Sequence, residues 1–196
     1  MAKPSLHLAL VAEADALLSR DPFALLTGML LDQQFPMERA FAGPATLAGR
    51  MGTPERLDPV VVAGYDPQAF ADLMSRPPAV HRFPGSMAGR VQALARVITD
   101  DYESRAEHLW ESAGTGAELF ARLRALPGFG DQKARIFTAL LGKQLKVRPT
   151  GWREAAGAYG EEGSRRSVAD VVDAVSLGEV RSYKQEMKRA MKAAQP

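Results

Sequence analysis

The segment Leu126–Leu145, LPGFGDQKARIFTALLGKQL, is the part of the chain that most strongly predicts its fold. It opens with a tight turn, Leu126 to Gly130, whose glycines stand where the backbone most needs free φ angles. From Asp131 onward, apolar residues recur three and four positions apart, which predicts an amphipathic helix. Residues 116–125 have a helical pattern as well. The segment therefore predicts two helices joined by a glycine hairpin.

A glycine hairpin of this kind can present bare backbone N–H groups to an anion, and the helix after it adds the positive end of its dipole. A nucleic-acid phosphate suits that geometry and needs no sequence-specific contact. A Pro-Gly-x-Gly turn is also often no more than a connection between helices, so this alternative stays open here. The DNA-binding candidates in and after the hairpin are Leu126, Gly128, Phe129, Gly130, Gln132 and Lys133.

Residues 126–134, LPGFGDQKA, closely resemble the helix-hairpin-helix signature L-P-G-[VI]-G-x-x-x-A of the HhH-GPD superfamily of base-excision DNA glycosylases. The resemblance extends over roughly residues 20–160, and the hairpin is its most specific part. It implies an all-α, two-lobed fold that receives a base flipped out of damaged duplex DNA. We expect one unit over residues 1–196, with a central helical lobe at about 22–145 and a second lobe formed by 1–20 and 150–196.

The order of helix signals supports the all-α class independently of the resemblance, because no stretch alternates like a strand. Asp21-Pro22 is a strong start for a helix that is nearly all apolar and that we expect to be buried. The expected helices lie at residues 6–18, 22–34, 37–51, 59–63, 67–75, from about 84 to about 102, 116–125 and from 131 onward, followed by two in the tail from 167 to 195.

Composition limits the chemistry that this chain can perform. With 196 residues it is long enough for one sizeable domain, and the absence of cysteine excludes disulfides and a cysteine-ligated iron–sulfur cluster. Three histidines far apart argue against a His-built metal site. We expect no metal site and no cofactor, except for a monovalent cation that the hairpin could hold.

The net charge is only +2, so any DNA binding must come from a local basic patch and not from overall charge. We find no signal peptide and no apolar run long enough for a membrane span. The sequence therefore predicts a cytoplasmic, nucleoid-associated monomer whose partner is double-stranded DNA. Basic residues of the tail either form a solvated face or hold flanking DNA.

Two adjacent amides, Gln33 and Gln34, close the buried helix in the sequence Leu31-Asp32-Gln33-Gln34. They could simply satisfy the carbonyl groups at the helix end. The alkyladenine-type branch of the resembled superfamily has a matching L-x-Q-Q near its lesion pocket, which implies a base pocket that includes both amides. We assign Trp152 to the same pocket. Arg90, near the start of a later helix, is a candidate phosphate contact beside the hairpin.

The catalytic aspartate of the resembled family falls on Thr150 when residues are counted from Leu126, and threonine carries no negative charge. If Thr150 caps the next helix, Glu154 lies one turn inside and its side chain points back toward the vacant position. We take Thr150 and Glu154 as the catalytic candidates, while Glu154 could equally complement the helix dipole. The Schiff-base lysine of bifunctional members falls on Gln132, with Lys133 turned about 100° away.

Two classes of function therefore remain. The first is a monofunctional DNA N-glycosylase without lyase activity, in which a carboxylate stabilises positive charge on the deoxyribose. The second is a catalytically silent helix-hairpin-helix module that binds DNA. The hairpin serves both functions, the missing aspartate favours the second, and the order of family-like elements favours the first.

Overall fold

A computed structural model describes residues 5–193, and its regular elements are all helical, as the sequence predicts. Among the described residues, α7 is a helix that the sequence prediction lacked. In chain order the elements are α1 (Ala12–Arg20), α2 (Pro22–Leu31), α3 (Met37–Arg50), α4 (Pro59–Gly64), α5 (Pro67–Ser75), α6 (Pro84–Asp101), α7 (His108–Glu111), α8 (Gly116–Ala125), α9 (Asp131–Gln144), α10 (Trp152–Ala156), the 3-10 helices η1 (Gly157–Tyr159) and η2 (Val168–Asp170), and α11 (Ala174–Ala193).

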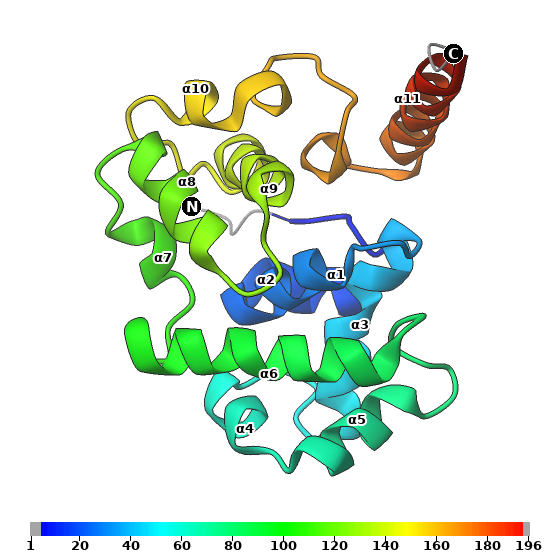
Figure 1. The fold of residues 1–196 in the computed structure, drawn as a ribbon, viewed down its shortest axis with the longest axis vertical. Helices are drawn as coiled ribbons and strands as arrows, with labels where there is room; N and C mark the ends of the chain where they lie inside the picture. Colours follow the sequence, from blue (N-terminus) through cyan, green and yellow to red (C-terminus); the bar gives the residue numbers. More distant parts are fainter. Residues whose placement is uncertain (1–4, 194–196) are drawn as a thin grey trace.

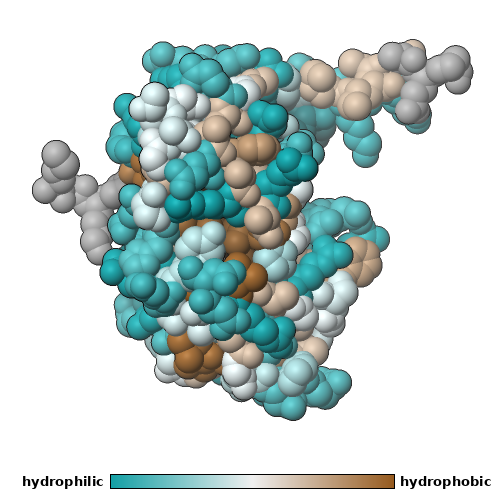
Figure 2. Space-filling model, turned by 60° about the vertical axis from the view of Figure 1, so that its left-hand side comes forward, coloured by the Kyte–Doolittle hydropathy of each residue, from teal (hydrophilic) through white to brown (hydrophobic). Residues whose placement is uncertain are grey.

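Helix α2 lies in the middle of the molecule, with α4, α5 and α6 on one side of it and α8, α9 and α10 on the other (Figure 1). Helices α1 and α3 pack against α2 and against each other, and α6 covers it from below. Helix α11 extends from the main body, and Figure 2 shows the same projection from another direction. None of the helices in residues 5–193 is long and apolar enough to cross a bilayer.

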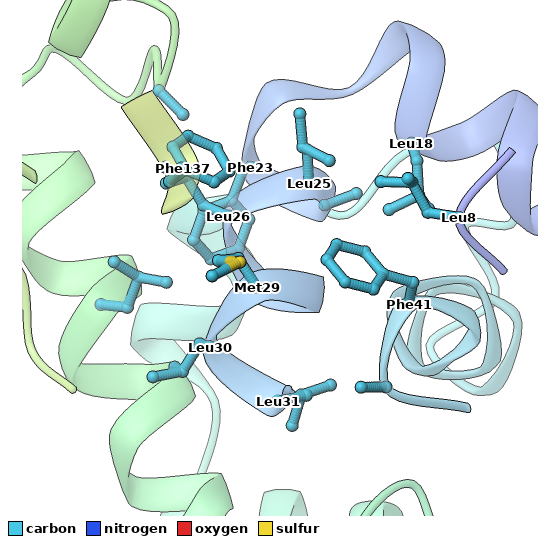
Figure 3. Close-up of a cluster of buried hydrophobic side chains, with 14 of the residues drawn as sticks. Leu8, Leu18, Phe23, Leu25, Leu26, Met29, Leu30, Leu31, Phe41 and Phe137 are labelled. Atoms are coloured by element: carbon cyan, nitrogen blue, oxygen red, sulfur yellow. The ribbon is translucent and has the colours of Figure 1, made fainter. Parts of the chain in front are cut away.

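The start of α2 is fixed by Asp21, as the sequence predicts. Its carboxylate accepts a hydrogen bond from the N–H of Ala24 at 3.0 Å, and Pro22 occupies the first helical position. The other carboxylate oxygen accepts from the N–H of Leu57 at 2.7 Å, which ties the cap to a distant loop. Every residue of α2 after Pro22 is buried, and Figure 3 shows its side chains among those of Phe41 in α3 and Phe137 in α9.

The first helix starts later than its apolar pattern predicts. Leu6 and Leu8 are buried, but they precede α1, which begins at Ala12. The buried carboxylate of Asp15 accepts hydrogen bonds from the N–H groups of Leu8 and Ala9, both at 2.8 Å. These bonds satisfy the backbone of a non-helical segment that lies across the end of its own helix, and Leu10 in that segment is exposed with φ of 56°.

The tail contains one long helix instead of two. Val168 belongs to a single 3-10 turn, η2, in which Ser167 and Asp170 form a capping box. Val172 and Val175, which the predicted helix would place beside Val168 on one apolar face, are exposed. The N-cap of α10 is Gly151, with φ of 77°, so Thr150 does not cap this helix. The end of the tail, residues 194–195, lies outside the described range.

The elements at the two ends of the chain pack against different neighbours. Helix α1 packs against α2 and α3, whereas α10 packs against α8 and α9, and η2 packs against α9. Residues of α1 therefore belong with the central helices and do not join the C-terminal ones. The reason is the apolar stripe of α1, whose Leu18 points toward Leu8 and the same core that surrounds α2 (Figure 3).

The glycine hairpin between α8 and α9 is docked on α2. Gly128 has φ of 77°, and a Cβ atom at this position would collide with the side chain of Leu30. The side chains of Leu126 and Phe129 are buried, and the ring of Phe129 meets that of Phe137 edge-on at 6.1 Å. Gly130 faces open space. One side of the hairpin is thus core, and the other is free.

Gly128→Ala should destabilise the protein by about 1–3 kcal/mol, because the added methyl is strained at positive φ and meets Leu30. Gly130→Ala in the same hairpin is the control. Its added Cβ meets no atom within 4 Å. Alanine caps the helix less well than glycine but lowers the entropy of the unfolded chain, so the free energy of unfolding should change by no more than about 0.5 kcal/mol. Urea unfolding of both variants checks the difference, and equal losses would contradict the docking of Gly128 on α2.

Candidate functional site

A cavity of about 680 Å³ lies between the end of α2, the first turns of α9, η1 and α11. Apolar and aromatic side chains make up much of its wall, as is usual for sites that hold small molecules or groups. The lining residues are Met29, Asp32, Gln34, Phe35, Gln132, Lys133, Ile136, Ala158, Tyr159, Arg166, Tyr183, Lys184, Met187, Lys188 and Met191.

The charges on this wall are strongly unequal. Four basic side chains line the cavity and a single carboxylate, that of Asp32, opposes them. A chain with a net charge of only +2 therefore concentrates positive charge at this opening. The basic residues are Lys133, Arg166, Lys184 and Lys188. This is the local basic patch that any binding of a polyanion requires.

Lys133 reaches from α9 to the last turn of α2. Its Nζ donates a hydrogen bond to the carbonyl oxygen of Leu30 at 3.0 Å and lies 5.8 Å from the centre of the Phe129 ring. The pKa of Lys133 is lowered to about 8, chiefly by burial; the charge of Asp32 opposes this change and that of Arg90 adds to it. Both Lys133 and Gln132, which helical geometry sets about 100° apart, line the cavity.

Asp32 is the C-cap residue of α2, and its backbone N–H donates to the carbonyl of Gly28 at 3.1 Å. Its side chain is half-buried on the cavity wall. Among the described residues, its carboxylate accepts no hydrogen bond and forms no ion pair within 4 Å. Burial raises the pKa of Asp32, while the charges of Lys184 and Lys133 act in the opposite direction.

The two amides after Asp32 point in different directions. Gln34, which has φ of 53°, lines the cavity. Gln33 turns elsewhere, and its Oε1 accepts a hydrogen bond from Arg90 Nη1 at 2.8 Å. Arg90 therefore holds this corner of the chain, in addition to any phosphate contact. The backbone carbonyl of Gln33 accepts from Nε2 of buried His81 at 3.0 Å, while Nδ1 of that ring accepts from the N–H of Phe83.

Thr150 and Glu154, the catalytic candidates, do not line the cavity. The carbonyl of Thr150 accepts a hydrogen bond from the N–H of Gly116 at 2.8 Å, which ties this segment to the start of α8. Glu154 is exposed, and its carboxylate lies near Gly151 at the start of its own helix. This position fits the alternative in which Glu154 complements the helix dipole.

Trp152, which we assigned to the base pocket, is a core residue instead. Its ring is 8% exposed and packs directly on Gly142 of α9, where no side chain larger than hydrogen fits. The guanidinium groups of Arg153 and Arg148 lie over the ring at 4.7 and 5.9 Å. Trp152 thus joins α10 to α9, and sequence reasoning overestimated it because exposed and buried tryptophans look alike in a sequence.

The free side of the hairpin consists of backbone. Gly130 is the N-cap of α9 and no side chain caps the first turn, so the N–H groups there have no side-chain partner. Arg124, at the end of α8, pairs with Asp131 at 2.7 Å beside the turn. Because Leu126 and Phe129 are buried, any DNA contact they make must come from their backbone.

Several cavity residues were not singled out from the sequence as site residues. Tyr159 accepts a hydrogen bond from Gln132 Nε2 at 3.0 Å, and Tyr183 accepts one from Arg166 at 2.9 Å. Helix α11 is further held by an ion pair of 2.6 Å between Arg181 and Glu38 of α3. No local signal in the sequence shows which part of the body α11 faces.

No group of three or more His, Cys, Asp or Glu residues in the described part of the chain could hold a metal ion. No protein-family model matches this chain, and no curated protein is detectably similar to it. The arrangement of the cavity and the hairpin is therefore the basis for assigning a function.

Lys133 should titrate near pH 8, more than 2 units below an ordinary lysine at about 10.4, because burial disfavours its ammonium form. The unfolded chain keeps this proton up to its ordinary pKa, so the contribution of Lys133 to stability rises between pH 8 and that value. The ¹³Cε shift of Lys133 against pH checks the midpoint, and Lys133→Gln assigns the resonance. A midpoint within half a unit of the other lysines would refute the burial argument.

Proposed function

We propose that this protein acts in base-excision DNA repair as a monofunctional DNA N-glycosylase that receives a flipped, damaged base from duplex DNA. The observation that carries the proposal is the position of the basic cavity, whose lining residues Gln132 and Lys133 stand in the first turn of the helix that the hairpin opens. A strand whose phosphate rests on that turn would have its neighbouring nucleotide at the cavity.

The hairpin supports phosphate binding on physical grounds. The uncapped N–H groups of α9, together with the positive end of its dipole, favour an anion at Gly130, where there is open space. The basic side chains of the cavity extend the same positive field over a wider area. Contacts of this kind hold duplex DNA in register without reading its sequence.

The cavity supports base recognition. Its volume of about 680 Å³ exceeds that of a nucleobase, and rings of Phe35, Tyr159 and Tyr183 stand on its wall for stacking. Gln34 and Gln132 offer amide donors and acceptors to the edge of a base. Aromatic faces combined with amides are the groups that hold flipped bases in general.

A catalytically silent DNA-binding module is the second candidate. It is favoured by Thr150, which carries no charge at the position where the resemblance expects the catalytic aspartate and which lies outside the cavity. Such a module would use the hairpin and the basic wall to bind duplex DNA without changing it. The two candidates differ only in whether a base is released.

Gly130→Asp should weaken binding to any duplex by at least ~10-fold relative to Gly130→Asn, because only the former adds a negative charge where a phosphate is expected. Both residues are good N-caps, so both variants should fold. Fluorescence anisotropy at two salt concentrations measures the affinities, and Gly130→Asp should also show the smaller salt slope. Equal affinities of the two folded variants would rule out phosphate binding at the hairpin.

Incubation with duplexes that carry uracil, alkylated purines, oxidised purines or mismatches should release a base from at least one of them. The product strand should break only after alkali treatment, and borohydride should trap no covalent adduct. A trapped adduct that disappears in Lys133→Gln would instead assign lyase chemistry to that amine on the cavity wall. Binding of every duplex without release of any base would select the silent module.

A further inference from the structure

The catalytic candidate Glu154 and the carboxylate beside the hairpin, Asp131, both stand away from the cavity. Glu154 is exposed at the start of α10, and Asp131 is engaged by Arg124 at 2.7 Å on the outer side of the hairpin. Neither of them lines the cavity. Among the lining residues, all of which lie in the described part of the chain, the only carboxylate is that of Asp32.

The surroundings of Asp32 leave its carboxylate available to a ligand. Lys133 approaches from α9, Lys184 from α11 and Glu38 from α3, but none of them forms a hydrogen bond or ion pair with it. Lys133 is engaged by the carbonyl of Leu30, at 3.0 Å. Glu38 is engaged by Arg181, at 2.6 Å. Asp32 thus lacks a direct partner although three charged side chains lie around it.

A half-buried carboxylate without a hydrogen-bond partner opposes folding, since it loses hydration and gains no direct contact in return. Groups of this kind cluster at sites that act on ligands, where a bound molecule supplies the missing contact. The ligand that fits Asp32 carries positive charge at the point of contact. The surrounding lysines and Arg166 suit the negative phosphates on either side of that point.

We propose that Asp32 is the catalytic carboxylate of this cavity, facing C1′ of the flipped deoxyribose in place of the aspartate that is missing at position 150. This inference rests on the proposed glycosylase function. When the C1′–N bond breaks, its electron pair leaves with the base and positive charge develops on the sugar ring. Asp32 stabilises that charge. A water molecule then bonds to C1′ and gives one proton to Asp32, which releases it to solvent, and the departing base takes up a proton.

Lys133 is a positioning residue in this scheme. Its hydrogen bond to the carbonyl of Leu30 holds the last turn of α2, two residues before Asp32, against α9. Its positive charge also favours the ionised form of the carboxylate. Lys133 and Asp32 share one wall of the cavity without pairing directly, because Lys133 is hydrogen-bonded to Leu30 and Asp32 in this scheme faces the sugar.

The test compares two duplexes that differ in charge at one atom. One carries a pyrrolidine analogue of an abasic sugar, which is cationic at neutral pH, and the other carries neutral tetrahydrofuran. Wild type should bind the pyrrolidine duplex at least ~10-fold more tightly. Asp32→Asn should bind the tetrahydrofuran duplex as wild type does and lose the preference for the cation. Glu154→Gln, which removes a carboxylate outside the cavity, should keep the preference.

The outcomes separate this inference from the proposed function. A wild-type protein that binds both duplexes equally, or an Asp32→Asn variant that keeps the preference, overturns the role of Asp32 and leaves DNA binding intact. Failure to bind any duplex overturns the proposed function. In that case the free pyrrolidine nucleoside analogue, titrated into ¹³C-labelled protein, still tests Asp32: an unmoved Asp32 Cγ resonance overturns its role and a shifted one supports it. Asp32→Ser provides a second neutral variant if Asp32→Asn does not fold.

Discussion

The contact between the end of α2 and the start of α9 is the interaction on which the rest of the structure depends. Leu30 makes two contacts there. Its side chain packs against Gly128, and its carbonyl oxygen accepts a hydrogen bond from Lys133. The first contact sets the hairpin against the buried helix, and the second holds the turn in which the cavity begins. A buried apolar helix thus ends at a polar site, and one leucine serves both parts.

This contact also explains how a chain with a small net charge forms a strongly basic cavity. The C-terminal end of α2 contacts the N-terminal end of α9. The carboxylate of Asp32, which follows α2, and the amine of Lys133, in the first turn of α9, therefore lie on the same wall of the cavity. Helix α11 then adds two more lysines from far along the sequence. The electrostatic character of the site is therefore a property of the fold and not of the overall composition.

Local signals in the sequence were sufficient for most helices. Asp21-Pro22 and Asp66-Pro67 begin α2 and α5 where expected, because a capping carboxylate followed by proline depends only on neighbours. The segment before α1 was misread because Leu6 and Leu8 are buried without being helical, and Asp15, which satisfies their backbone, acts across a turn. The apolar residues of this segment therefore reflect tertiary packing and not a helix.

The site was harder to predict than the fold, for a physical reason. Gln34 and Gln132, both named as site residues from the sequence, line the cavity, while Asp32, between Leu31 and the two amides, was passed over as a helix end. Whether such a residue faces solvent, core or cavity depends on the direction of the chain after the helix, and φ of 53° at Gln34 is not encoded locally. Trp152 and Glu154 were assigned to the site but lie outside the cavity. The segment before α10 is hydrogen-bonded to the start of α8, and this long-range contact also leaves no local signal in the sequence.

The attachment of α11 has a consequence for how this protein could diversify. The helix supplies one wall of the cavity, yet it packs on the body through η2 and an exposed ion pair between Arg181 and Glu38. The width of the cavity is therefore set by the angle of a single peripheral helix. Substitutions along residues 174–193 can change the shape of the cavity while α2, the hairpin and Asp32 remain as they are. The α11 wall of the cavity and the wall that carries Asp32 therefore lie in parts of the chain that can evolve separately.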